Sequence, residues 1–267
     1  MNIESARTFL FVPGDRPDRF AKAQHSGADV IIIDLEDAVR AESKQVAAEN
    51  LLAWIGAGNK AAVRINSLGT PWYEDDLAAI AGQPVSAIVI PKAQSLEELE
   101  QLAIATQAPL LPIIETAVGM VRLEQLLAHP AVVRILFGSQ DYSTDLGVSP
   151  DDAQALAAAR SSLVLASRVH GLPGPVDGPT RTWSDPEIVE KDARRARSMG
   201  FTGKLCIHPA QLQPTLRGLA PTDDEVAWAL KVVGSGNVGG ATSAGGEMVD
   251  QPVIDRARQI LASRATR

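Results

Sequence analysis

The chain has 267 residues, a formal net charge of −7 at pH 7 and hydrophobic residues at 45% of its positions. Its length fits a single α/β barrel, and its apolar fraction is sufficient for a large core. An acidic chain without a basic amphipathic stretch is a poor candidate for binding nucleic acids or membrane surfaces.

The sequence also indicates the compartment. The N-terminal residues show neither the apolar region nor the small-residue cleavage site of a signal peptide. No apolar run is long enough to cross a bilayer. Cys206 is the single cysteine and cannot form an internal disulfide, which is typical of proteins in a reducing cytosol. We therefore expect a cytoplasmic protein.

Short apolar runs recur along the chain, each followed by a polar or glycine-marked turn and a segment of helical periodicity. Most of these runs are continuously apolar, as in parallel strands that are buried on both faces. They predict eight strands, at Thr8–Val12, Val30–Ile33, Ala61–Ile65, Ala87–Ile90, Leu110–Ile114, Arg134–Phe137, Gly174–Val176 and Lys204–Ile207.

The segments between these runs predict helices, because apolar residues recur there at helical spacing. Two such stripes are Ala47, Leu51, Trp54 and Ile55, and then Tyr73, Leu77, Ile80 and Ala81. Predicted capping boxes pair Ser95 with Glu98, Ser184 with Glu187 and Thr222 with Glu225. Pro17 and Pro150 suit first helical positions, and Gly27, Gly171 and Gly200 suit helix ends.

Eight strand–helix units predict an α/β fold, a (β/α)₈ TIM barrel, over residues 1–233. A doubly wound open sheet is the competing fold, but it often carries a glycine-rich phosphate loop that the turn after the first strand lacks. Residues 234–267 predict a C-terminal extension. It contains a Gly/Ser-rich linker at 234–246 and a last helix, capped by Asp250, that could act as a lid or arm.

In such a barrel the active site is built at the carboxyl ends of the strands. Glu115 and Asp141 follow the fifth and sixth predicted strands, which are neighbours in the barrel. Two adjacent carboxylates suit a hard divalent cation such as Mg²⁺. Either residue could equally cap the helix that follows it, and spacing alone leaves both interpretations open.

Arg64 ends the third predicted strand, and its planar fork suits a substrate carboxylate or a developing oxyanion. The alternative is a structural ion pair with Glu36 or Asp37, and Asp37 could also cap the next helix. His208 could be a general base, although a turn residue is the simpler interpretation. Cys206 is expected to be a small core residue.

Seven segments then follow one another in an order and spacing that resemble the citrate lyase beta-subunit-like family, the acyl-CoA lyase branch of the HpcH/HpaI aldolase superfamily. They are FLFVPGDRPDRF, IIIDLEDAV, VRINSLGTPW, IVIPKAQS, IIETAVG, FGSQDYSTDLG and GFTGKLCIHPAQ. The resemblance covers nearly the whole chain and implies a TIM barrel that binds Mg²⁺ and makes or breaks a C–C bond beside a thioester.

The resemblance also implies roles for individual residues. Glu115 and Asp141 would bind the metal, Glu36 and Asp37 would hold its waters, and Arg64 would bind the 2-oxo acid or the oxygen that carries charge. Gly14, Arg16 and Gly138 would lie against substrate or CoA. Asp250, supplied by the next subunit of a trimer or hexamer, would complete the site. Val118 departs from the family, because many members carry a basic residue there.

The function implied is a Mg²⁺-dependent carbon–carbon lyase. It would cleave a 3-hydroxy-3-carboxy acyl-CoA, such as citramalyl-, malyl- or citryl-CoA, into a 2-oxo acid and an acyl-CoA such as acetyl-CoA. Three alternatives stay open at this point. One is a malate synthase or malyl-CoA thioesterase activity, another is a CoA-independent class II pyruvate aldolase, and the third is a citrate lyase beta-type subunit that needs partner proteins and an acyl-carrier thioester.

Overall fold

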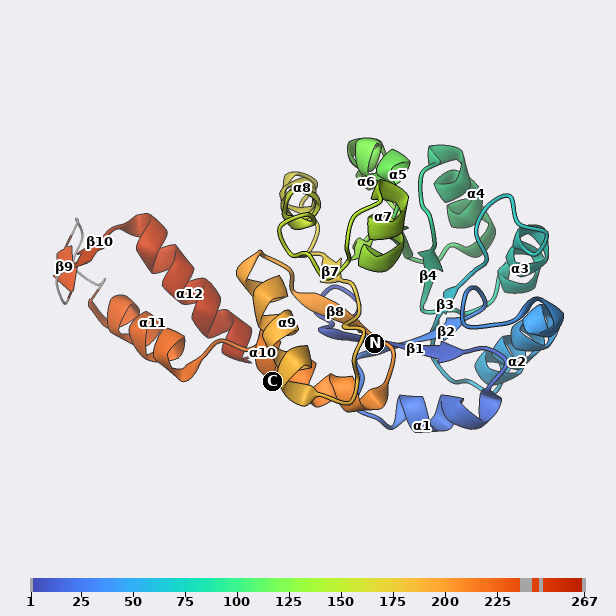
Figure 1. Ribbon diagram of the computed structural model, residues 1–267, viewed down its shortest axis with the longest axis horizontal. Helices are drawn as coiled ribbons and strands as arrows, with labels where there is room; N and C mark the ends of the chain where they lie inside the picture. Colours follow the sequence, from blue (N-terminus) through green and yellow to red (C-terminus); the bar gives the residue numbers. More distant parts are fainter. Residues whose placement is uncertain (1, 236–241, 245–246, 266–267) are drawn as a thin grey trace.

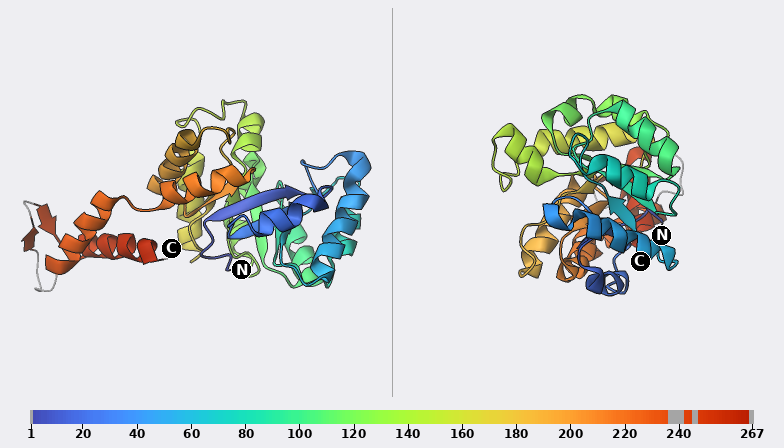
Figure 2. Two further views of the ribbon diagram at one scale, coloured as in Figure 1. Left: turned by 90° about the horizontal axis from the view of Figure 1, so that it is seen from below. Right: turned by 90° about the vertical axis from the view of Figure 1, so that its right-hand side faces the viewer.

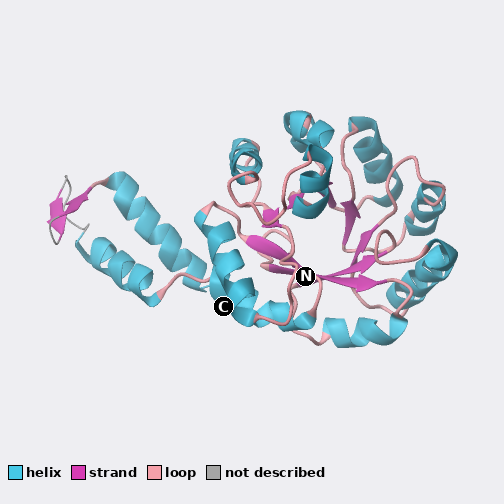
Figure 3. Ribbon diagram, in the orientation of Figure 1, coloured by secondary structure: helices cyan, strands magenta, loops and turns pink. Residues whose placement is uncertain are grey.

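The computed structural model describes residues 2–235, 242–244 and 247–265. Eight parallel strands form a closed barrel in the order β1 to β8, so the predicted TIM barrel is confirmed and the open sheet is excluded. Figure 3 shows these strands in magenta with the helices, in cyan, around them. The strands are β1 (Thr8–Pro13), β2 (Val30–Asp34), β3 (Ala62–Arg64), β4 (Ala87–Ile90), β5 (Leu110–Ile114), β6 (Leu136–Phe137), β7 (Val176–Asp177) and β8 (Gly203–Cys206).

Helices connect successive strands and cover the outside of the barrel (Figure 1). The α-helices of the barrel are α1 (Phe20–Gln24), α2 (Lys44–Gly56), α3 (Tyr73–Ile80), α4 (Leu96–Thr106), α5 (Ala117–Val121), α6 (Leu123–Leu127), α7 (Ser139–Leu146), α8 (Ala157–Val169), α9 (Pro186–Ser198) and α10 (Leu212–Leu219). Short 3₁₀ turns are η1 (Pro17–Arg19), η2 (Ala41–Ser43) and η3 (Pro209–Gln211).

The strands are buried on both faces, as their continuous apolar runs predicted. Phe9, Ile32 and Val89 belong to the core inside the barrel. Their sequence neighbours Leu10 and Ile33 belong to the larger core between the strands and the helices. Successive strand residues point to opposite faces, so both faces of each strand must be apolar. The two cores together fix the strand ends that carry the polar site.

Some predicted boundaries are wrong by a few residues. β6 begins at Leu136, because the side chain of Arg134 is buried at the other end of the barrel and donates hydrogen bonds to the carbonyls of Ile3, Ala6 and Gly174. β7 likewise covers Val176–Asp177, and the predicted start at Gly174 lies outside it.

The helix caps differ in detail as well. The cap of α9 is Asp185 and not Ser184, since the Asp185 carboxylate accepts hydrogen bonds from the first-turn amides. Pro150 lies in a turn before α8 and does not start that helix. The reciprocal box between Thr222 and Glu225 is confirmed at the start of α11 (Asp223–Ser235). Ser95 caps α4 by accepting from the Glu98 amide.

The chain continues beyond the barrel as an arm, made of α11, β9 (Thr242–Ala244), β10 (Glu247–Val249) and α12 (Gln251–Ala265). Figure 1 and the left view of Figure 2 both show the arm projecting away from the barrel, with β9 and β10 at its far end. The arm has a small core of its own, built around Ala229, Val232, Val249 and Ala257.

The predicted division between residues 233 and 234 falls inside α11, and the arm begins with this helix. Part of the predicted linker, at 236–241 and 245–246, lies outside the described residues; its part at 242–244 pairs with β10 as an antiparallel hairpin. Within the part of the chain that the structure describes, no helix is long and apolar enough to cross a membrane.

Candidate active site

A cavity of about 390 Å³ opens at the carboxyl ends of the strands. It brings together five of the residues singled out in the sequence, which are Asp37, Arg64, Glu115, Gly138 and Asp141. Apolar side chains from β1 and β8, among them Phe11 and Leu205, form another part of its wall. The barrel thus collects charged groups from the ends of four strands around one space with a partly apolar wall.

Arg64, the last residue of β3, is held by a planar two-point contact. Its Nε and Nη2 donate to the two carboxylate oxygens of Asp34, at 2.7 and 2.6 Å. Nη1 lies 3.1 Å from Glu36 and 3.7 Å from Asp37. Burial alone would lower the pKa of Arg64, but Asp34 and Glu36 raise it above its ordinary value, so the side chain stays a fixed cation.

The structural pair expected as the alternative for Arg64 is therefore present, and its main partner is Asp34. Asp34 is fully buried, and its carboxylate also accepts from the amides of Glu36 and Ala38. The guanidinium still lines the cavity, and it lies 4.7 Å from the ring of Phe11. Because Asp34 fixes the guanidinium of Arg64 and this guanidinium also lines the cavity, it can bind an oxyanion without changing its position.

Glu36 is buried beside Arg64 and is held by Lys92 and Ser67. The Lys92 ammonium donates to Oε1 of Glu36 at 2.8 Å, and the Ser67 hydroxyl donates to the same oxygen. Burial lowers the pKa of Lys92, but the bond to Glu36 and the nearby carboxylates raise it above its ordinary value. Glu36 thus sits between two cations and orients them.

Lys44 fixes the turn that carries these carboxylates. Its buried ammonium donates to the carbonyls of Leu35 and Glu36 and to the side-chain oxygen of Asn66. Asn66 in turn donates to the carboxylate of Asp76 through its backbone and side-chain nitrogens. The turn after β2 therefore rests on a buried polar network and not on a helix cap by Asp37, which the sequence had left open. Asp37 caps no helix, and its side chain is 59% exposed.

Glu115 is buried at the end of β5 with its carboxylate in the cavity. Burial raises its pKa to about 8; the amide of Lys92, which donates to Oε1 at 2.7 Å, opposes this shift, while the charges of Glu36 and Asp141 add to it. The alternative in which Glu115 caps the next helix is excluded, because Thr116 caps α5.

Asp141 lies in the first turn of α7, and in the described residues its carboxylate has no hydrogen bond or ion pair. Gly138 makes room for the pair. A Cβ at this position would fall 2.2 Å from Oε2 of Glu115 and 2.4 Å from its Cβ. Only glycine therefore lets Glu115 take its place beside the start of α7.

These carboxylates fit a hard divalent cation. The described residues contain no group of three or more His, Cys, Asp and Glu side chains arranged to hold a metal. Two carboxylates suffice for Mg²⁺, which keeps waters and substrate oxygens as its other ligands. Burial raises the pKa of Glu115, and the carboxylate of Asp141 nearby raises it further. A cation bound between the two would stabilise both negative charges.

Four residues expected at the site do not line this cavity: Gly14, Arg16, Glu36 and Asp250. Gly14 packs against α2 and β2, where a Cβ would lie 2.9 Å from both Ala47 and the Asp34 carbonyl oxygen. Arg16 forms an exposed ion pair with Asp18. Asp250 immediately precedes α12, which starts at the far end of the arm, away from the barrel to which it is attached (Figure 1).

Other residues behave as the simpler interpretations predicted. His208 caps η3, where its Nδ1 accepts from the Ala210 amide, and its ring stacks on Trp183. Cys206 is buried in β8, and burial raises its pKa to about 11. Val118 is exposed on the first turn of α5 and does not line the cavity.

Sequence reasoning missed Asp34, Lys44 and Lys92 as parts of the site. Lys92 and Asp34 each lie at a strand end, so their position was a usable signal. The side chain of Lys44 points back from α2 to the turn after β2, and spacing does not reveal such a contact.

Comparison with known proteins places this geometry in a family. Residues 7–209 match the HpcH/HpaI aldolase/citrate lyase family. A citrate lyase subunit beta-like protein of Deinococcus radiodurans is 35% identical over 97% of both chains. A (3S)-malyl-CoA thioesterase of Cereibacter sphaeroides is 32% identical over 96% of this chain and 93% of the relative.

Solved structures agree. CitE of Mycobacterium tuberculosis, in complex with magnesium, acetoacetate and coenzyme A, superposes with a TM-score of 0.88 at 32% identity, covering 98% of this chain and 100% of that one. RipC of Yersinia pestis gives a TM-score of 0.73 at 31% identity, covering 84% of this chain and 100% of that one. The resemblance seen in the motifs is thereby confirmed, and the chain belongs to the HpcH/HpaI aldolase/citrate lyase family.

Proposed function

We propose that the protein is a Mg²⁺-dependent carbon–carbon lyase that cleaves a 3-hydroxy-3-carboxy acyl-CoA into a 2-oxo acid and an acyl-CoA. The observation that carries the proposal is the shared cavity of Arg64, Glu115 and Asp141. The guanidinium of Arg64 and the carboxylates of Glu115 and Asp141, which suit a metal, line the same space. A substrate with a carboxylate next to a hydroxyl could therefore be bound by the guanidinium and by the metal at the same time.

Glu115 and Asp141 would hold the magnesium ion, as the fit of their carboxylates suggests. The ion supplies Lewis acidity that lowers the pKa of the substrate hydroxyl. Arg64 binds the adjoining oxygen with its preorganised guanidinium, and Asp34 keeps that guanidinium in plane. Support for the ion comes from the M. tuberculosis CitE structures, several of which are described as magnesium complexes.

The reaction then needs two proton transfers. The hydroxyl proton leaves to the exposed carboxylate of Asp37 at the cavity wall. The oxygen lone pair becomes the carbonyl of the 2-oxo acid, the C–C bond breaks, and its electron pair moves into the thioester as an enolate. A proton delivered to the enolate carbon completes the acyl-CoA.

We assign that last proton to Asp250 of a second copy. Asp250 lies between β10 and α12, and this end of the arm projects away from the barrel, so we assign its carboxylate to the cavity of another copy and not to that of its own chain. Asp250 is exposed and positioned just before α12 by a bond from the Val253 amide to its carboxylate. A homo-oligomer, with three or six copies, would bring it to a neighbouring cavity.

The CoA part of the substrate is assigned to the turn after β1, near Gly14 and Arg16. Pro13 of this turn lines the cavity, which connects the turn to the reacting centre. Coenzyme A is part of one CitE complex, and the thioesterase relatives are named for malyl-CoA. Gly138 remains the position against which the substrate packs beside Glu115. A cytoplasmic location completes the proposal.

Thioester hydrolysis is the second candidate, because relatives 32–33% identical are named (3S)-malyl-CoA thioesterases. In that reaction the C–C bond stays intact and free CoA appears. A third possibility is that the chain needs partner subunits, since a citrate lyase subunit beta of Leuconostoc mesenteroides is 30% identical over 97% of this chain.

One assay separates these candidates. The purified protein is incubated with citramalyl-, malyl- and citryl-CoA, with Mg²⁺ or with EDTA, while 2-oxo acid and free thiol are measured in parallel. The lyase predicts 2-oxo acid without thiol, and only with Mg²⁺. Thiol release favours the thioesterase, and absence of both products from every substrate would contradict lyase activity of the chain alone.

A further inference from the structure

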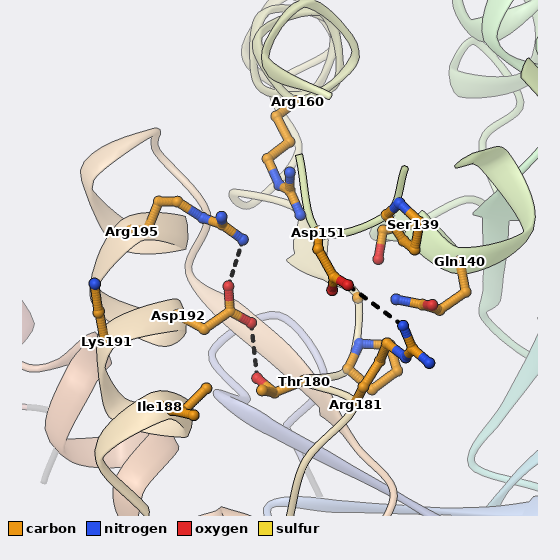
Figure 4. Close-up of a pocket in the computed structure, with 13 residues that line it drawn as sticks. Ser139, Gln140, Asp151, Arg160, Thr180, Arg181, Ile188, Lys191, Asp192 and Arg195 are labelled. Carbon is orange, nitrogen blue, oxygen red and sulfur yellow. Dashed lines mark hydrogen bonds and ion pairs between the residues drawn. The ribbon is translucent and has the colours of Figure 1, made fainter. Parts of the chain in front are cut away.

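A second pocket, of about 250 Å³, lies beside the reaction cavity between α8, α9 and the connections that follow β6 and β7 (Figure 4). Both spaces are lined by Ser139, Gln140 and Pro179, so the two adjoin. The reaction proposed above gives this pocket no role. Six of its thirteen lining residues are charged, and four of these are cationic: Arg160, Arg181, Lys191 and Arg195.

The pocket carries excess positive charge in a chain whose net charge is negative. Its lining holds only two carboxylates, Asp151 and Asp192, against the four cations. Arg181 pairs with Asp151, and Arg195 with Asp192. Asp177 and Lys204 lie just behind the lining, pair with lining residues and have opposite signs, so they leave the excess unchanged.

Some donors around the pocket are not used. The Nε of Arg195 is buried and has no hydrogen-bond partner. Lys191, four residues before it on α9, forms no ion pair with any described residue. Arg160 is buried and holds Asp177 through Nε and Nη2, which leaves its Nη1 without a protein acceptor in the described part of the chain. Unsatisfied buried donors cost free energy unless an acceptor fills the space.

We propose that this pocket binds a phosphate-class oxyanion. Arginine forks match the geometry of such groups, and an excess of two positive charges suits a dianion. Barrels of this kind frequently bind phosphate at the loops that follow the seventh and eighth strands, and the residues from Gly178 to Arg181 form the connection after β7.

Inorganic phosphate is the probe for the test, titrated into the full-length protein by calorimetry at constant ionic strength. We expect one saturable site per chain. Arg195→Lys keeps a cation beside Asp192 but removes the unsatisfied Nε, and it should weaken binding about fivefold. Lys191→Gln, which breaks no ion pair, should weaken it about threefold or more. Lys60→Gln, an equal loss of charge on an exposed residue before β3, should leave binding unchanged.

Competition identifies the source of the oxyanion. Displacement of phosphate by CoA but not by 3′-dephospho-CoA assigns the pocket to the 3′-phosphate of CoA, and displacement by both assigns it to the CoA diphosphate. Displacement by neither assigns it to a free oxyanion. The proposal is overturned if wild-type protein shows no saturable phosphate binding, or if both variants bind like wild type. It is also overturned if the variants alter only the oligomeric state, because the pocket then holds a segment of a second copy.

Discussion

The backbone amide of Lys92 donates a 2.7 Å hydrogen bond to Oε1 of Glu115, while the ammonium group of the same residue donates to Glu36. Lys92 adopts this position with a φ of 46°, in the left-handed region that residues other than glycine rarely occupy. Strain of this kind persists where surrounding contacts enforce it, and it concentrates at functional sites. Lys92 thus links Glu115, the carboxylate that we propose as a metal ligand, to Glu36, the carboxylate beside Arg64.

We expect Lys92→Met to lower kcat/KM at least about tenfold, because Glu36 loses its cation and the preorganised cluster shifts. Lys92→Gly should lose a similar factor but raise the melting temperature relative to Lys92→Met, since glycine tolerates a φ of 46°. Steady-state kinetics and thermal melting check both effects, and Lys60→Met is the matched control. Full activity of Lys92→Met would exclude a positioning role for the ammonium.

Glu115→Gln should abolish magnesium binding and lower turnover by roughly a thousandfold, because an amide cannot replace a charged ligand of a hard cation. Calorimetric titration with Mg²⁺ gives the binding readout independently of activity. Glu100→Gln, which neutralises an exposed carboxylate on α4, serves as the control. Unchanged Mg²⁺ affinity in Glu115→Gln would remove this residue from the metal site.

The assignment of Asp250 to a neighbouring cavity predicts complementation. Asp250→Asn and Arg64→Lys homo-oligomers should each be nearly inactive. When the two are unfolded together and reassembled, mixed oligomers contain some sites with both native residues, so a part of the wild-type activity should return. Two variants that act within the same chain would show no recovery after mixing.

Glu98 provides a prediction about stability that does not involve the site. It is buried on α4, its Oε1 has no hydrogen-bond partner, and burial raises its pKa from 4.5 to about 7. The unfolded chain ionises this group from about pH 4.5 upward, whereas the folded protein resists ionisation until about pH 7. The penalty to stability therefore appears between these values and is constant above them.

Glu98→Gln removes the penalty. The free energy of unfolding should equal that of wild type near pH 4 and exceed it by roughly 3 kcal/mol at pH 8, from 1.36 kcal/mol for each pKa unit. Denaturant unfolding at several pH values measures the difference, with Glu100→Gln, exposed on the same helix, as the control. A difference that did not grow with pH would show that Glu98 is not the source.

The sequence predicted the barrel well because its evidence is periodic and repeated. Each strand must be apolar on both faces, so each leaves the same signature. The strand-end rule also brought Arg64, Glu115 and Asp141 to one cavity, although spacing could not decide between metal ligand and helix cap. Thr116 resolves that question for Glu115, because the cap position of α5 is already filled.

Errors arose where a side chain reaches a distant partner. The sequence predicted that Arg134 starts a strand. Its side chain instead donates hydrogen bonds to the carbonyls of Ile3 and Ala6, at the end of the barrel opposite the cavity. In the sequence, Asp34 is one of three acidic residues in the segment from Asp34 to Asp37. Only the structure shows that its carboxylate accepts two hydrogen bonds from Arg64. Such contacts depend on the register of neighbouring strands, about which a local pattern carries no information.

Gly138 contributes no functional group, yet it is one of the least replaceable positions in the chain. The volume that any Cβ would occupy there already belongs to Glu115. A scan of substitutions at 138 should therefore find every other residue inactive, including alanine, the smallest addition. Activity therefore depends on the absence of a side chain at position 138 as much as on the charged groups of the cavity.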